Sequence, residues 1–172
     1  MVSRPVLLIA IVLAAIAGGF TVYLVTNNNS TSNNAPSSNT SNTNLPTSGT
    51  NLDYSNNGLT AFPKEILNHT DATSLNLSNN QLSGALPAEI KNLKKLEVLN
   101  VSNNRMTGIP AEIGQMTSLK VINYSNNRIT GLPLELGNLT ELQLLDLSGN
   151  QNLSQQDLNQ IKVKLPNTQI KQ

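Results

Sequence analysis

The sequence of 172 residues lacks cysteine and tryptophan, and aromatic residues make up only 3% of it. Without cysteine the chain can form no disulfide, no thiolate metal site and no cysteine nucleophile. It also holds a single histidine, His69, in the segment Asn68-His69-Thr70. That segment follows an expected helix, so we interpret His69 as an exposed turn residue rather than as a metal ligand or a catalytic base.

Charged residues are also scarce: 11 are basic and 10 are acidic, together 12% of the chain. Arg4 is the only one among the first 50 residues, which leaves 11 − 1 = 10 basic and 10 acidic residues in the rest. A domain that binds nucleic acid is expected to present a basic face. The balance of charge therefore predicts that nucleic acid is not a partner.

The N-terminal segment contains a long apolar run. Residues 6–25 carry no charge, and as a helix they would span about 30 Å, the thickness of the hydrocarbon core of a membrane. We therefore predict a transmembrane signal-anchor in residues 1–26, with Arg4 keeping the N-terminus in the cytoplasm and the remainder of the chain extracytoplasmic. The alternative is a cleaved signal peptide, because Ala15-Ile16-Ala17 offers a cleavage site; cleavage after Ala17 would give a secreted protein.

Residues 27–50 consist mainly of asparagine, serine and threonine and carry no charge. They have almost nothing to bury, so folding could not offset the entropy of ordering them. We predict a disordered linker that tethers the following domain to the membrane.

From residue 51 onward one stretch occurs in five copies. Its fullest copy is Leu99-Asn-Val-Ser-Asn-Asn-Arg-Met106. The second asparagine of the copies recurs every 23 or 24 residues, at Asn57, Asn80, Asn104, Asn127 and Asn150. A fixed period of this size is typical of a repeat architecture. Apolar residues alternate within each copy, as Leu99 and Val101 do, which predicts a short strand with one buried face.

The units share the pattern L-x-x-L-x-L-x-x-N-x-L, and with it residues 49–172 resemble the leucine-rich repeat family. The resemblance implies an α/β solenoid over residues 51–172, with a parallel concave sheet and short convex helices in about five repeats. Residues 165–170 resemble a truncated sixth strand, which would cap the C-terminal end. Extracellular animal and plant members usually have cysteine-rich caps, so the lack of cysteine favours a small membrane-anchored member of bacterial type.

The turn after each strand leaves buried backbone groups that need partners, and an asparagine amide offers both a donor and an acceptor. By resemblance to the family, the recurring asparagines Asn57, Asn80, Asn104, Asn127 and Asn150 form a structural ladder.

The second half of each of the first four units carries a proline followed two residues later by a glutamate. Proline suits the first position of a helix, and a glutamate near that end is stabilised by the helix dipole. A row of glutamates could also bind a cation, but helix-end stabilisation explains it, and we predict no metal and no cofactor. The prolines are Pro63, Pro87, Pro110 and Pro133, and the glutamates are Glu65, Glu89, Glu112 and Glu135. The fifth unit begins its helix with Ser154-Gln-Gln-Asp157, which resembles a capping box.

No sequence motif for catalysis is present. The chain has no P-loop, no dinucleotide-binding fingerprint and no serine within Gly-x-Ser-x-Gly. Asp53 and Asp146 share an outward strand position, but four strand spacings of about 4.8 Å would place them about 19 Å apart. Glycosidases need two carboxylates about 5 to 9.5 Å apart. We therefore predict that the protein is not an enzyme.

Two interpretations of the function stay open. The first is a membrane-tethered binding module for a protein, a peptide or a glycan. The resemblance implies that it binds through the concave face, the outward strand positions Val98, Asn100, Ser102, Val121, Asn123, Ser125, Leu144, Asp146 and Ser148. The second is a structural or passive surface protein without a specific ligand, which the near-identical Asn and Ser of successive units favour. Tryptophan, tyrosine and arginine, the usual interface anchors, are absent from these positions, so any binding is expected to be micromolar or weaker.

Overall fold

The computed structural model describes residues 10–16, 19–25 and 50–172. The chain divides near residue 48 into an N-terminal unit and a repeat domain, Gly49–Gln172, and each is considered by itself.

The N-terminal unit contains two strands where the sequence predicted one helix. β1 (Ala10–Ile16) pairs antiparallel with β2 (Gly19–Val25), and Ile16 lies opposite Gly19. Apolar runs of this length do not distinguish helix from strand, and the run is rich in branched residues and interrupted by glycine, both of which favour a hairpin. In the described ranges no helix is long and apolar enough to cross a membrane. Arg4, the cleavage site after Ala17 and the linker before Thr50 lie outside those ranges. Membrane tethering and the linker therefore stay predictions, whereas residues 10–16 and 19–25 do not form the single helix that was expected.

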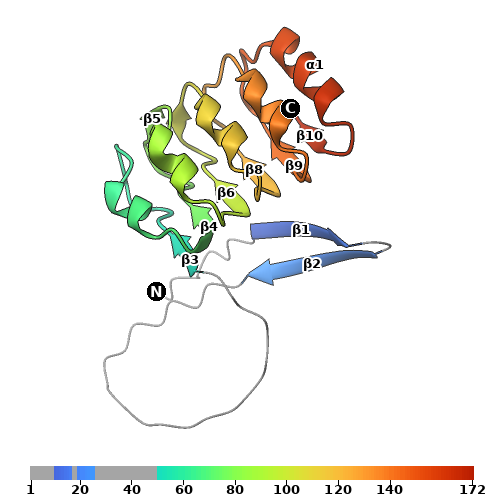
Figure 1. The fold of residues 1–172 in the computed structure, drawn as a ribbon. Coiled ribbons are helices and arrows are strands. Elements are labelled where there is room, and N and C mark those ends of the chain that lie inside the picture. The colour runs from blue at the N-terminus through green and yellow to red at the C-terminus, as the bar shows by residue number, and fades with distance from the viewer. Residues whose placement is uncertain (1–9, 17–18, 26–49) are drawn as a thin grey trace, which may run out of the picture. The chain divides into compact units, whose positions relative to one another are not determined.

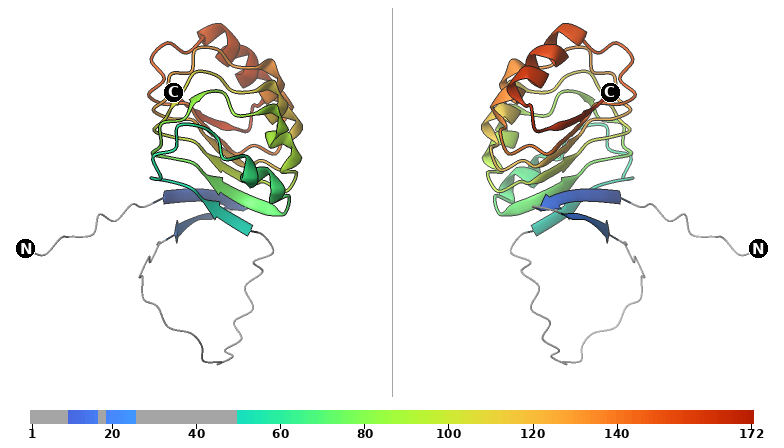
Figure 2. Two further views of the ribbon diagram at one scale, coloured as in Figure 1. Left: turned by 90° about the vertical axis from the view of Figure 1, so that its left-hand side faces the viewer. Right: turned by 90° about the vertical axis from the view of Figure 1, so that its right-hand side faces the viewer.

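The repeat domain is built on a parallel sheet of six strands (Figure 1). Its order is the order of the chain, so each unit adds one strand beside the last. The units stack in sequence from the first strand to the C-terminal helix (Figure 2). The strands are β3 (Thr50–Asp53), β4 (Ala72–Asn76), β6 (Val98–Asn100), β8 (Val121–Asn123), β9 (Leu144–Asp146) and β10 (Gln169–Lys171). The predicted solenoid is confirmed, and β10 pairs with β9 as the predicted cap strand.

Short helices lie on the opposite side of each unit from the sheet. The first four are 3₁₀ helices, η1 (Lys64–Asn68), η2 (Ala88–Asn92), η3 (Ala111–Gln115) and η4 (Leu134–Asn138). Five residues are too few to nucleate an α-helix, and the tighter 3₁₀ turn suits them. The sequence predicted the four prolines at the first helical position. In the structure they stand at the N-cap with extended backbones, and each helix begins one residue later.

The fifth unit ends in an α-helix, α1 (Gln155–Lys164). Ser154 caps it as the sequence predicted, because the Asp157 N–H donates to the Ser154 Oγ over 3.2 Å. A second, two-stranded sheet joins β5 (Ser83–Gly84) to β7 (Arg105–Met106) at the turns that follow the main sheet.

The apolar core runs without a break through the stack, from Ile66 to Leu165. The alternating strand residues predicted to be buried are buried from the second unit onward. In the first unit Leu52 and Tyr54 are only partly buried, because within residues 50–172 only the second unit packs against them. Tyr124 is fully buried, and its hydroxyl finds no partner among the described residues. Burial raises the pKa of Tyr124.

Candidate ligand-binding site

The turns that frame the sheet are held by asparagine amides. The Asn104 Oδ1 accepts a hydrogen bond from the Leu82 N–H of the preceding unit over 3.0 Å. Its Nδ2 donates to the main-chain oxygens of Leu77, Val101 and Ser102 at 3.0 to 3.2 Å. Asn80, Asn127 and Asn150 repeat the arrangement, and all four side chains are buried. Each amide thus joins two neighbouring units and completes the turn of the earlier one.

Asn57 differs from the other four asparagines of the predicted ladder. It is exposed, and only its main-chain N–H takes part, by donating to the Asn80 Oδ1 over 3.0 Å. A ladder asparagine bonds groups that lie 21 to 27 residues earlier, as Asn80 does with Tyr54. For Asn57 those positions fall outside the described residues.

A second row of asparagines was missed by the sequence analysis. Asn56, Asn79, Asn103 and Asn126 all have a positive φ, between 53° and 58°, and Gly149 takes the same place in the fifth unit with φ 75°. Asparagine and glycine are the residues that tolerate this left-handed backbone. The signal was present in the sequence, because the position before the ladder asparagine is always one of these two residues.

The concave face is made of two rows of side chains that lie in register across the strands. One row comprises Ser74, Val98, Val121, Leu144 and Gln169; the other comprises Asn76, Asn100, Asn123, Asp146 and Lys171. The structure therefore brings the predicted strand residues together on one surface.

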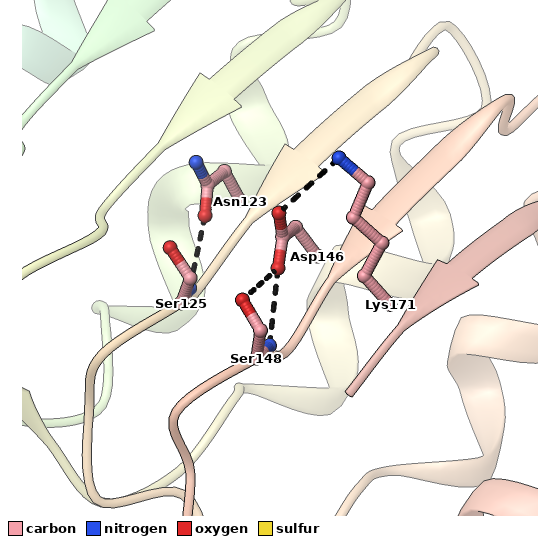
Figure 3. A network of polar contacts seen from close by, with 5 residues as sticks. All are labelled: Asn123, Ser125, Asp146, Ser148 and Lys171. Atoms are coloured by element: carbon pink, nitrogen blue, oxygen red, sulfur yellow. Dashed lines mark hydrogen bonds and ion pairs between the residues drawn. The ribbon is translucent and has the colours of Figure 1, made fainter.

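The residues of the polar row hold the turns that follow the strands. The Oδ1 of Asn100 and of Asn123 accepts the N–H of the serine two residues later, over 3.1 and 2.9 Å. Asp146 does the same for the Ser148 N–H at 3.0 Å and also accepts the Ser148 hydroxyl at 2.6 Å (Figure 3). These are local side-chain turns of the kind that asparagine and aspartate favour. The sequence predicted these side chains as ligand contacts only, whereas in the structure their oxygens also accept hydrogen bonds from the turns.

The apolar row, Val98, Val121 and Leu144, faces outward from the sheet but is not exposed to solvent. Val121 is only 9% exposed and Leu144 only 8%, while Val98 is half-buried. Strands lie about 4.8 Å apart, so neighbouring branched side chains cover one another from the side. Ser102 and Ser125 are buried as well. The accessible part of the concave face is therefore chiefly the polar row.

Charges near this face are paired. The Lys171 Nζ lies 3.9 Å from the Asp146 Oδ2, and the Lys120 Nζ lies 2.8 Å from the Glu97 Oε2 just before the strands begin (Figure 3 shows the first pair). Asp53 and Asp146 are on β3 and β9, with three strands between them. The structure does not bring these two carboxylates together.

The other candidates from the sequence have structural surroundings. His69 is half-buried and closes η1, because its N–H donates to the Ile66 main-chain oxygen over 3.1 Å. The four glutamates lie in the first turns of η1 to η4. Across residues 50–172 and the described part of the N-terminal unit, no group of three or more His, Cys, Asp and Glu residues could hold a metal ion.

Comparisons with known proteins agree with this geometry. A leucine-rich repeat protein of Leptospira interrogans is 32% identical, with a TM-score of 0.54, over 64% of this chain and 34% of that protein. The plant peptide hormone receptor RGFR1, solved in complex with RGF2, is 35% identical, with a TM-score of 0.55, over 66% of this chain and 18% of the receptor. The ectodomain of the receptor kinase SOBIR1 from Arabidopsis thaliana is 25% identical, with a TM-score of 0.51, over 84% of this chain and 67% of the ectodomain.

This chain spans well under two thirds of the length of the first two of these proteins. No curated protein sequence matches it. The sequence profile described as a leucine-rich repeat region matches residues 55–166, which is more than half of the chain. Together with the parallel sheet and the asparagine ladder, this match establishes that the chain belongs to the leucine-rich repeat family.

Proposed function

We propose that the repeat domain is a binding module for a protein or peptide, and that the partner lies on the concave face. Two similar structures support this proposal. RGFR1 was solved in complex with RGF2, and the receptor kinase GASSHO1/SCHENGEN3 of Arabidopsis thaliana with CASPARIAN STRIP INTEGRITY FACTOR 2; each receptor is 35% identical to this chain. Each of them is much longer than this chain, so the proposal needs support from this chain's own residues.

The observation that carries the proposal is a row of three amide donors. In Asn76, Asn100 and Asn123 the Oδ1 is fixed by the following turn, and no described residue accepts a hydrogen bond from the Nδ2. Figure 3 shows the Asn123 nitrogen on the side away from Ser125. The donors repeat at the strand spacing of about 4.8 Å. They suit a partner rich in acceptors, such as the carbonyls of an extended peptide; the hydroxyls of a glycan are the second acceptor set that this row suits.

Binding through this row is weak for a single copy. The face has no aromatic or arginine anchor, and its valine and leucine side chains are mostly covered. Each hydrogen bond contributes about 1 kcal/mol net, so micromolar or weaker affinity follows. Many copies on one membrane would raise the effective affinity. Tethering through residues 6–25 is therefore part of the proposal, and the uncharged apolar run supports it.

A passive structural role is the second candidate, and a specific observation favours it. The side chains that would contact a ligand already hold the turns, and the hydroxyls of Ser78 and Ser148 donate inward to Asn76 and Asp146. Because these polar groups already stabilise the turns, their presence on the surface does not require a binding partner.

The decisive variant is Asn100→Asp, which keeps the Oδ1 that the Ser102 N–H needs and removes the Nδ2 donor. Asp146 shows that this turn accepts an aspartate. The row neighbours Asn76 and Asn123 are neutral, so the new carboxylate meets no like charge at this position on either adjacent strand.

The immobilised fragment 45–172 is used to capture partners, and calorimetry then compares the parent with the variant. The variant is expected to bind about fivefold or more weakly, the loss of one hydrogen bond, with an unchanged melting temperature. Gln115→Glu in η3, an exposed position on the other side of the unit, introduces the same charge and should bind like the parent. Equal affinity of the Asn100 variant and the parent would exclude the amide row, and no capture at all would favour the passive role.

The anchor is tested by fractionation. The full-length protein should remain in the membrane pellet after a high-salt wash, whereas the fragment that starts at Thr47 should be soluble. A mature N-terminus at Gly18 in peptide sequencing would replace the anchor with secretion.

A further inference from the structure

Two arginines occupy the same position in consecutive units. Arg105 and Arg128 each follow a ladder asparagine directly, and both are exposed. The Arg128 N–H donates to the Met106 main-chain oxygen over 2.8 Å, so the two arginines stand on adjacent backbones. Stacked backbones of this kind lie about 4.8 Å apart, which brings two guanidinium groups within reach of one ligand.

These two positive charges have no counter-charge in the described part of the chain. The ion pairs there are Lys120 with Glu97 and Lys171 with Asp146, and neither involves an arginine. Asp157 of the fifth unit accepts the Leu132 N–H on its Oδ2 over 3.1 Å, and it forms no ion pair with Arg128. Like charges so close together repel each other, and an anion between them relieves the repulsion.

A polar hollow of about 250 Å³ lies next to Arg128. It is lined by Asn127, Arg128, Gly149, Gln151 and Asn152, and none of these residues is acidic. The hollow occurs where the fifth unit departs from the repeat: Gly149, with φ 75°, stands where the earlier units have an asparagine side chain. The guanidinium and the side-chain amides of Gln151 and Asn152 are all hydrogen-bond donors.

We propose that Arg105 and Arg128, with the hollow beside Arg128, form a binding site for an oxyanion, a carboxylate or phosphate group carried by a partner. The planar guanidinium presents parallel N–H donors that match two oxygens of such a group. The site lies beyond the six-stranded sheet, at β7 and the turns around it, so it does not depend on binding to the concave face.

The proposal is tested on the full-length chain, kept in an uncharged detergent, by residue-resolved NMR. Sodium phosphate and sodium acetate are the probes at pH 7, and sodium chloride at the same ionic strength is the reference. Arg105→Gln and Arg128→Gln are the test variants, because the flanking units carry Gln81 and Gln151 at these positions and the fold accepts them there. The control is Lys94→Gln with Lys95→Gln, which removes two exposed positive charges elsewhere on the domain.

Saturable shifts are expected for the arginine Nε–H groups and for the amides of residues 149, 151 and 152. Each arginine variant should weaken binding about tenfold, as expected when a charge-assisted hydrogen bond is lost, and the lysine control should bind like the parent. Whichever probe binds more tightly identifies the oxyanion class, and either result supports the site. Equal shifts with chloride, no saturation with either probe, or unchanged binding in the two arginine variants would each overturn the proposal.

Discussion

Replacing Asn104 with leucine should destabilise the repeat domain although the new side chain is more apolar. Asn104 is in the middle of the ladder and is 9% exposed. Leucine has a similar size, so the substitution removes hydrogen bonds without leaving a large cavity. The expected loss can be worked out from the groups that Asn104 serves.

The Leu82 N–H loses its only partner, the Asn104 Oδ1. An orphaned buried donor costs about 1 to 3 kcal/mol. The carbonyls lose less, because each keeps another bond: Leu77 from Asn80, Val101 from Asn127, and Ser102 from the Asn79 N–H. The Asn104 amide has two N–H groups, so two bonds to these carbonyls are counted as lost. Losing two such bonds costs about 1 kcal/mol each. The apolar gain of leucine offsets part of this, so we expect a net loss of about 3 kcal/mol in the free energy of unfolding.

Urea unfolding followed by circular dichroism measures this loss, with Asn57→Leu as the matched control. Asn57 has the same place in its unit, yet it is exposed and bonds only through its main chain. That variant should unfold within about 0.5 kcal/mol of the parent, as substitutions at exposed positions usually do. If Asn104→Leu and Asn57→Leu changed the midpoint equally, the ladder would not stabilise the domain and the reasoning would be refuted.

Two further substitutions probe the core. Tyr124→Phe should raise the free energy of unfolding by about 1 kcal/mol, because the buried hydroxyl has no partner among the described residues. Burial raises the pKa of Tyr124 in the folded state. The stability linked to the protonated phenol is therefore complete below the unfolded pKa of about 10 and is lost as the pH rises above it. Urea midpoints between pH 9 and 11 should fall less in the phenylalanine variant than in the parent. Gly114→Ala should cost about 1 to 3 kcal/mol in thermal unfolding, because a Cβ there would overlap the main-chain oxygen of Glu135. Gly108→Ala, whose Cβ would meet nothing nearer than 4.0 Å, should leave the melting temperature unchanged.

Much of the fold could be predicted from the repeat period alone. A residue type that returns every 23 residues has the same neighbours in each unit, so one correct interpretation of Asn104 holds for Asn80, Asn127 and Asn150. The same reasoning located the strands, the buried leucines and the C-terminal cap strand. Asn57 departed from it because, within the described residues, no unit precedes the first one.

Features that depend on three-dimensional neighbours could not be predicted. Alternation assigns Val121 and Leu144 to the outer side of a strand, but the lateral cover from adjacent strands decides how much of them water reaches. Similarly, the pattern Asn-x-Ser does not reveal that the Asn123 oxygen binds the Ser125 N–H. In the N-terminal unit the length and apolar character of one run were compatible with a helix and with the hairpin of β1 and β2, and its branched residues and glycines are weak local signals for the hairpin.

The asparagine ladder also gives the stack a direction. Asn80, Asn104, Asn127 and Asn150 each complete the turn of the unit that precedes them, never the one that follows. During synthesis, the main-chain N–H that corresponds to that of Leu82 in each turn therefore finds its acceptor only after about one more unit of chain has emerged. Truncation is asymmetric for the same reason. Deleting the first unit removes N–H groups that donate to a ladder asparagine, whereas deleting the fifth unit removes Asn150, whose Oδ1 accepts the Ile129 N–H. A duplicated unit inserted inside the array would bring its own ladder asparagine, so every turn would keep an acceptor for its main-chain N–H.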